Sequence, residues 1–141
     1  MQQLSERHPN IVQFHKAFST VHNYYIFMEY CDVGDLSSFI RERYIRLNPA
    51  ARNSRLSDPK FYINENESSY IVRDIVRGLA HLQFVYKIMH RDIKLDNILV
   101  KLKNRRSSKL RSSRDKFCLP IDSYEFKLGD LGLAKTFKRD S

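Results

Sequence analysis

Residues 90–97, "HRDIKLDN", place a carboxylate, an ammonium group and a carboxamide within six positions. Phosphoryl transfer needs such groups, because a hydroxyl must be oriented, phosphate charge neutralised and magnesium held by oxygen ligands. We expect Asp92 to orient the hydroxyl proton, and Lys94, two residues on in an extended loop, to face the phosphate from the same side. Asn97 would offer magnesium a neutral oxygen and Asp130 a charged one.

This octapeptide, followed by "DLG" at 130–132, resembles the catalytic loop and metal-binding turn of eukaryotic protein kinases. The resemblance implies a kinase-like α+β fold, ATP and Mg²⁺ as cofactors and protein substrates, and Lys94 is typical of serine/threonine kinases. It also implies that His90 packs beneath the metal-binding turn and that Arg91 pairs with a phosphorylated activation segment. Leu131 replaces the commoner Phe, but it is apolar and of adequate size, so we expect no loss of function.

Two further stretches, "HPNIV" at 8–12 and "MEYCDVGDL" at 28–36, resemble the turn before the fourth kinase strand and the hinge that holds adenine. In that resemblance Met28 is the gatekeeper, and the backbones of Glu29 and Cys31 bind the adenine edge. Asp35 would reach the ribose hydroxyls or act as a helix N-cap, two compatible roles. Leu99 would pack beneath the adenine, although a leucine is more often simply a core residue.

The elements that must position these residues can be read from periodicity. Residues 11–14 favour a short strand, and the apolar run 23–31 favours a buried one. Helical spacing follows Asp35 until Pro49. Asn64 with Glu67 resembles a capping box, and the apolar residues behind it predict an amphipathic helix to about Tyr86. Short strands are expected at "KIM" and "ILV" and at 126–128, before the metal-binding turn.

The resemblance divides the chain into a small-lobe remnant (1–28), a hinge (29–34) and the start of a large lobe (35–141). Insertions are expected at about 48–66 and 101–124, both rich in polar residues. Their positions, together with "MEYCDVGDLSSFI", are similar to those of fungal members of the autophagy-initiating kinase family. That similarity implies regulatory subunits of a kinase complex as partners, besides protein substrates.

Composition narrows the function classes. The net charge is +9, but residues 101–116 hold eight Lys or Arg and one Asp, so +7 of it belongs to one segment. No aromatic residue interleaves these cations, which disfavours nucleic acid as a partner. Cys31 and Cys118 are far apart and are expected to be reduced thiols. With no membrane-length apolar run or signal peptide, we expect a cytoplasmic protein, the nucleus remaining open.

The 141 residues contain no G-x-G-x-x-G loop and no phosphate-binding Lys before the hinge, and they end eleven residues after Asp130. We therefore expect a truncated kinase domain that is inactive by itself and marginally stable, with Ile71, Ile75 or Leu79 facing solvent. Two alternatives stay open: a catalytically dead, kinase-derived interaction module, and binding of an anionic surface or nucleic acid through residues 101–116.

Overall fold

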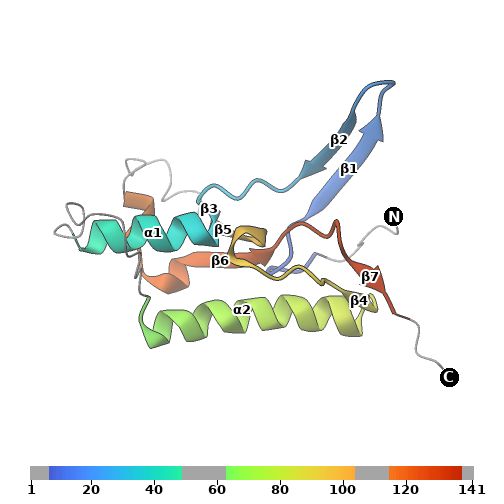
Figure 1. Ribbon diagram of the computed structural model, residues 1–141. Coiled ribbons are helices and arrows are strands. Elements are labelled where there is room, and N and C mark those ends of the chain that lie inside the picture. Colours follow the sequence, from blue (N-terminus) through green and yellow to red (C-terminus); the bar gives the residue numbers. More distant parts are fainter. Residues whose placement is uncertain (1–6, 49–62, 104–114, 138–141) are drawn as a thin grey trace.

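The computed structural model describes residues 7–48, 63–103 and 115–137 (Figure 1). Most of the two expected insertions, residues 49–62 and 104–114, lies outside the described residues. The elements in chain order are β1 (Phe14–Ser19), β2 (Tyr24–Met28), β3 (Gly34–Asp35), α1 (Leu36–Leu47), α2 (Glu65–Phe84), β4 (Ile88–Met89), η2 (Leu95–Asn97), β5 (Ile98–Leu102), η3 (Asp115–Phe117), η4 (Ile121–Ser123), β6 (Tyr124–Leu128) and β7 (Lys135–Thr136). This mixture of helices and strands confirms the α+β class.

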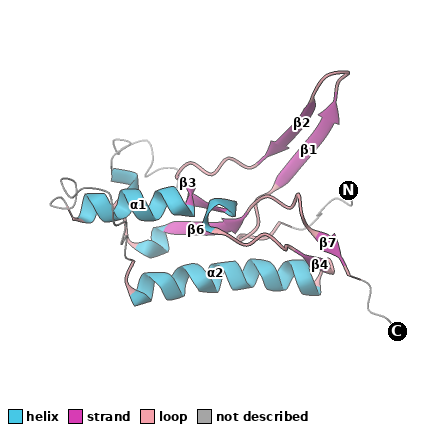
Figure 2. Cartoon of the chain, in the orientation of Figure 1, coloured by secondary structure: helices cyan, strands magenta, loops and turns pink. Residues whose placement is uncertain are grey.

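The core lies around a three-stranded antiparallel sheet in the order β3-β5-β6, with α1 and α2 on either side of it (Figures 1 and 2). Val100 of β5 pairs with Phe126 of β6, and both side chains are fully buried. Phe39 of α1 packs edge-on against Tyr124 and Phe126, with ring centroids 4.8 and 5.9 Å away. These aromatic contacts hold α1 against the sheet whose strands β5 and β6 flank residues 90–97 and 130–132.

Both helices begin at the predicted caps. The Asp35 side chain accepts a hydrogen bond of 2.7 Å from the backbone N–H of Ser38, and Asn64 accepts one of 2.9 Å from Glu67. The α2 helix includes Asn66, the last residue of the first expected insertion, and it ends two residues before the predicted Tyr86. One cap therefore marked each helix start, and Pro49 marked the end of α1, whereas the end of α2 carries no comparable signal.

Parts of the second expected insertion, 101–124, belong to the folded body. Lys101 and Leu102 still belong to β5, and Phe117 and Leu119 are buried in the core. The buried Arg43 of α1 fixes this segment, because its Nη1 donates to the carbonyl oxygens of both Phe117 and Leu119 at 2.8 Å. The sequence analysis assigned Phe117 and Leu119 to a polar insertion, because a long polar run precedes them.

In the predicted capping box, the Glu67 side chain binds Arg43 of α1. The carboxylate of Glu67 forms an ion pair with the guanidinium of Arg43, which joins the first turn of α2 to α1. Both side chains are largely buried, and a paired, hydrogen-bonded arrangement offsets the cost of burying these charges. Glu67 therefore acts between helices.

The solvent-facing side of α2 differs from the prediction. Ile71 is buried, and Ile75 and Leu79 pack against the core, whereas Val72 and Val76 are more than half exposed. The helical repeat of 3.6 residues places the first three on one stripe and the two valines beside it. The prediction that Ile71, Ile75 or Leu79 faces solvent was wrong, because these three residues lie on the stripe that packs against the core.

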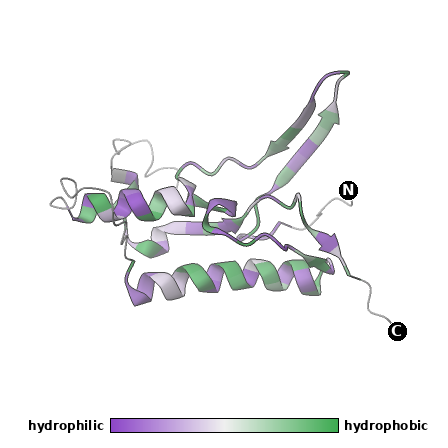
Figure 3. Ribbon diagram, viewed as in Figure 1, coloured by the Kyte–Doolittle hydropathy of each residue, from purple (hydrophilic) through white to green (hydrophobic). Residues whose placement is uncertain are grey.

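The β1–β2 pair forms a two-stranded ribbon that projects from the body (Figure 1). β2 lies within the predicted strand 23–31, whereas β1 shares only Phe14 with the strand predicted at 11–14. Burial of the 23–31 run was not confirmed, since every residue of β2 is exposed. Green, hydrophobic stretches alternate with purple, hydrophilic ones along the ribbon in Figure 3. Within the described residues, no other element covers either face, so apolar composition alone misjudged its environment.

The described helices include no segment with the length and apolar character needed to cross a bilayer.

Candidate active site

The segment 90–97 connects β4 to β5 and lies against the turn that follows β6. His90 is buried, and its Nε2 lies 2.8 Å from the carbonyl oxygen of Gly129. Its Nδ1 accepts a hydrogen bond of 3.3 Å from the backbone N–H of Asp92, so Nε2 is the nitrogen that carries the proton toward Gly129. His90 therefore joins the catalytic loop to the metal-binding turn, as the sequence predicts.

Asp92, Lys94 and Asn97 converge on one another. Oδ2 of Asp92 lies 3.0 Å from Nζ of Lys94 and accepts a hydrogen bond of 2.7 Å from Nδ2 of Asn97. Nδ2 also donates to the Asp92 carbonyl oxygen at 2.9 Å. Both side-chain contacts fall on Oδ2, which leaves Oδ1 of Asp92 for a hydroxyl donor and the amide oxygen of Asn97 for a cation.

The same contacts determine the charge of this cluster. The hydrogen bond from Lys94, followed by that from Asn97, holds the pKa of Asp92 below its ordinary value. The hydrogen bond to Asp92 in turn raises the pKa of Lys94, and the charge of Asp130 adds to that effect. Asp92 is therefore an ionised acceptor at neutral pH, suited to orienting a hydroxyl.

Asp130 lies in the metal-binding turn with a positive φ of 48°, a region that costs energy for a residue with a side chain. The turn is held by two hydrogen bonds, one of 2.8 Å from Gly129 N–H to the Asn97 carbonyl and one of 3.0 Å from Gly132 N–H to Oδ1 of Asp130. The first bond ties the turn to the catalytic loop directly. The Asp130 carboxylate is exposed, so it is accessible to a cation.

Arg91 has a positive φ of 67°, and its Nε donates to the carbonyl oxygen of Leu133 at 2.7 Å. Arg91 thus holds the chain just beyond the metal-binding turn, a contact the sequence did not suggest. Its pairing with a phosphorylated segment stays a prediction. Leu131 is half-buried and packs against the hydrophobic core, which suits its apolar character.

The predicted adenine-binding residues lie along the hinge and β5. Asp35 pairs with Leu99 in the β3–β5 ladder, so these two are brought together. The backbone N–H of Glu29 donates to the Gln13 carbonyl at 2.8 Å, so this N–H is engaged within the fold, and adenine binding by the Glu29 backbone stays a prediction. Cys31 is buried, and burial raises the pKa of its thiol to about 11. Met28 ends β2 with half of its surface exposed.

The cysteines are both free, as predicted, with Cys31 buried and Cys118 exposed.

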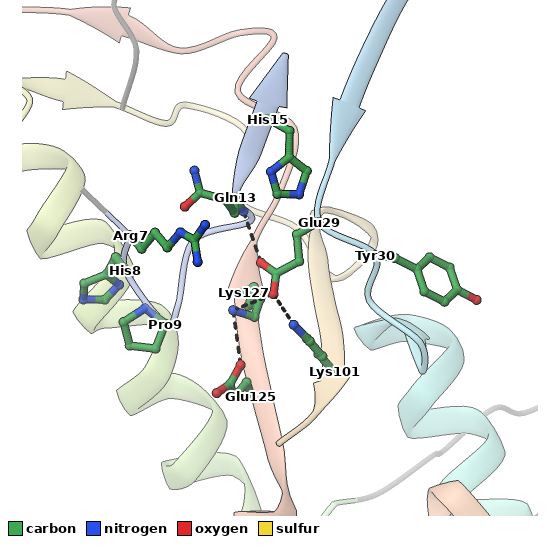
Figure 4. A pocket seen from close by; sticks show the side chains of 10 residues that line it. All are labelled: Arg7, His8, Pro9, Gln13, His15, Glu29, Tyr30, Lys101, Glu125 and Lys127. Carbon is green, nitrogen blue, oxygen red and sulfur yellow. Dashed lines mark hydrogen bonds and ion pairs between the residues drawn. The ribbon is translucent and has the colours of Figure 1, made fainter. Parts of the chain in front are cut away.

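The sequence analysis assigned a role to the backbone of Glu29 and did not predict the ion pairs of its side chain. Its carboxylate forms ion pairs with Lys101 and, at 3.3 Å, with Lys127, and it accepts a hydrogen bond of 3.2 Å from Gln13 N–H (Figure 4). These residues line a polar cavity of about 560 Å³ beside the hinge. The one available signal was Lys127, a cation flanked by apolar residues within a short strand, but its partner could not be inferred from spacing.

The cations of the basic segment that the structure describes have internal contacts. Lys101 binds Glu29, Lys103 donates to the hydroxyl of Tyr70 at 2.7 Å, and Lys116 donates to the Asp32 carbonyl at 2.7 Å. These three charges are therefore engaged within the fold, and they give no support to binding of an anionic surface.

A family model for the protein kinase domain matches residues 1–141. The chain belongs to the protein kinase domain family. The predicted kinase lineage and kinase-like fold are confirmed by this match, and the catalytic loop and metal-binding turn of the fold are the segments joined by His90 and Asn97.

Curated relatives are serine/threonine kinases. Serine/threonine-protein kinase ATG1 of Gibberella zeae is 28% identical over 147 residues, covering 96% of this chain and 16% of that protein. Serine/threonine-protein kinase apg-1 of Neurospora crassa is 35% identical over 98 residues, covering 67% and 10%. Serine/threonine-protein kinase PLK4 of Drosophila grimshawi is 32% identical over 133 residues, covering 94% and 13%. The matched part of this chain thus covers only 10–16% of the length of each of these relatives.

The oxygen atoms of Asp130 and Asn97 are suitable ligands for the Mg²⁺ that protein kinases use. Mg²⁺ prefers octahedral oxygen ligands and commonly uses one or two protein carboxylates together with phosphate oxygens. Asp130 offers an exposed carboxylate, and Asn97 keeps its amide oxygen because its nitrogen is bound to Asp92. These are the two residues predicted to hold the ion.

Proposed function

We propose that this kinase domain takes part in ATP-dependent transfer of a phosphoryl group to Ser or Thr hydroxyls of protein substrates. The observation that supports this most directly is the convergence of Lys94 and Asn97 on Oδ2 of Asp92. That geometry keeps the carboxylate ionised and directs its other oxygen to a hydroxyl. Relatives named as serine/threonine kinases support the same acceptor class.

In this proposal each residue has a distinct task. Asp92 accepts the hydroxyl proton through Oδ1 and orients the attacking oxygen, while the ammonium group of Lys94 faces the transferred phosphate. Asn97 and Asp130 would hold Mg²⁺, which neutralises phosphate charge when bound. The hinge backbone at Glu29 and Cys31 would bind adenine, with Leu99 beneath it and Asp35 at the ribose.

The similarity to ATG1 and apg-1 kinases supports a narrower proposal, membership in the fungal autophagy-initiating group, with regulatory subunits as partners. The chain is 28% and 35% identical to these proteins and 32% identical to PLK4, which is not named as one of them. Identity therefore supports the protein kinase family more strongly than the autophagy-initiating group.

Binding of Mg-ATP to the chain tests the nucleotide site. We expect Asp130→Asn to weaken Mg²⁺-dependent binding at least about tenfold, because a charged ligand oxygen is lost, while the exposed Asp122→Asn leaves it unchanged. Isothermal titration with and without Mg²⁺ measures both. Equal affinity of wild type and Asp130→Asn would contradict the assignment.

Transfer itself is measured with labelled ATP and a basic Ser/Thr peptide. Because these 141 residues lack a glycine-rich loop and a phosphate-binding Lys, we expect the rate to stay at background. Turnover that Asp92→Asn abolishes would refute the expectation of inactivity and establish the kinase reaction. Absent turnover together with Mg-ATP binding that does not depend on Asp130 would favour the non-catalytic alternative for this polypeptide.

A further inference from the structure

The far end of the hinge is anchored to β5 by backbone contacts. Oδ1 of Asp32 accepts a hydrogen bond of 3.1 Å from Leu102 N–H, and Val33 N–H donates to the Val100 carbonyl at 3.2 Å. The Asp32 side chain and the Val33 N–H are thus both hydrogen-bonded to β5. The carbonyl oxygen of Asp32 is bound by a residue from another segment.

That segment is η3, which lies 84 residues further along the chain. Nζ of Lys116 donates to the Asp32 carbonyl oxygen at 2.7 Å, and the Lys116 side chain is half-buried. A hydrogen bond from a charged donor is shorter and about twice as strong as a neutral one. The contact is therefore a substantial restraint on the peptide unit after Asp32.

A second lysine restrains the near end of the hinge. Lys101 pairs with the Glu29 carboxylate, which also accepts a hydrogen bond from Gln13 N–H (Figure 4). Residues 29 and 32 are therefore each held by an ammonium group from β5 or η3. Cys31 lies between these two fixed points, and its side chain is buried.

We propose that Lys116 is a positioning residue for nucleotide binding, which acts by clamping the hinge peptide at Asp32 so that the backbone of Cys31 is presented to adenine in one conformation. The inference rests on the proposed function, since it assigns adenine to this hinge. A hinge that is already ordered loses less conformational entropy when it binds a ligand. Lys116 touches no nucleotide and acts through Asp32.

Three variants separate positioning from a general structural role. Lys116→Met removes the ammonium group, Lys116→Arg keeps a charged donor, and Lys103→Met makes the same change on the other side of residues 104–114. Among the described residues, the Lys103 ammonium group contacts the hydroxyl and ring of Tyr70 in α2, whereas that of Lys116 contacts the hinge. Dissociation constants are measured for Mg-ATP and for Mg-tripolyphosphate, which lacks adenine.

We expect Lys116→Met to weaken Mg-ATP binding by roughly three- to tenfold, the effect of one lost hydrogen bond, and to leave tripolyphosphate binding unchanged. Lys116→Arg and Lys103→Met should stay within about twofold of wild type. Equal Mg-ATP affinity of Lys116→Met and Lys103→Met would overturn the inference. So would an equal loss for tripolyphosphate, which would indicate a general structural defect.

Hydrogen exchange of the hinge distinguishes failure of the clamp from failure of the proposed function. If wild type binds no adenine nucleotide, the proposed function fails, and the positioning role fails with it. Peptides covering 29–33 should nevertheless exchange faster in Lys116→Met than in Lys103→Met, because a restraint on the backbone is lost. Identical exchange in the two variants would show that the clamp itself is absent.

Discussion

Asp92 and Glu29 are two carboxylates whose surroundings suit them to different tasks. Asp92 contacts Lys94 and Asn97 through one oxygen and keeps the other available. Glu29 is largely buried and receives hydrogen bonds from Lys101 and Gln13 N–H. The first arrangement suits an acceptor for a substrate hydroxyl, whereas the second restrains the hinge backbone.

The Glu29 ion pairs should make stability depend on pH. Burial raises the pKa of Glu29, but the hydrogen bonds from Lys101 and Gln13 and the Lys127 charge outweigh it, so the pKa lies below the ordinary 4.5. A depressed carboxyl pKa contributes stability above 4.5, and this is lost as pH falls through the folded-state value. Glu29→Gln should therefore destabilise the protein near neutral pH and much less at about pH 3.

Urea unfolding of wild type and Glu29→Gln at the two pH values measures this difference. Asp122→Asn, a neutralised exposed carboxylate in η4, is the control and should change little at either pH. A Glu29→Gln effect that is as large in acid as at neutral pH would show that the ion pairs are not its cause.

At the scale of elements, α2 crosses β6 at Gly78. A Cβ atom there would lie 2.6 Å from the Asn10 carbonyl oxygen and 2.9 Å from Cδ1 of Leu128. Asn10 cannot readily move, because its Nδ2 donates to the Phe126 carbonyl at 3.0 Å and its own carbonyl accepts from Leu128 N–H at 2.9 Å. The absence of a side chain at Gly78 thus allows the helix to approach the strand that leads to the metal-binding turn.

Gly78→Ala should consequently destabilise the protein, although alanine favours a helix by about 1 kcal/mol over glycine. We expect a net loss of roughly 1–3 kcal/mol in the free energy of unfolding, from overpacking against backbone atoms. Ser69→Ala, at an exposed position of the same helix, should be neutral or slightly stabilising. Urea titrations compare the two, and a stabilised Gly78→Ala variant would refute the close contact.

At the scale of the whole molecule, apolar surface gathers on the β1–β2 ribbon. Phe18 stacks on Tyr25 and Phe27 with centroid distances of 4.9 and 5.6 Å, and the three residues stay 40–46% exposed. Isolated two-stranded ribbons are marginally stable in water. An exposed aromatic face on such a ribbon favours association between molecules.

We therefore expect the purified chain to self-associate as its concentration rises, and the double variant Phe18→Ser with Phe27→Ser to shift it toward monomer. Sedimentation velocity over a concentration series measures the species present. Val21→Ser is a suitable control, because Val21 is 93% exposed but lies in the turn outside this aromatic face. Equal association of the double variant and the control would place the contact elsewhere.

The short-range chemistry was accessible from the sequence. The octapeptide at 90–97 predicted a loop in which Asp92 and Lys94 share one side, and the structure brings them within 3.0 Å. Asp35 and Asn64 predicted two helix starts, because a capping side chain acts on a backbone N–H three residues away. In both cases the interacting groups are close in sequence, so local spacing carries the information.

Tertiary structure decided the rest. The sequence by itself determined the kinase family resemblance, the catalytic residue types and most element starts, since these depend on neighbouring residues. The exposure of β2 depends on which elements pack against it, and the contacts of Glu67, Lys101 and Lys116 join residues dozens of positions apart. Such contacts arise only when packing brings distant elements together, and composition or periodicity does not encode which ones meet.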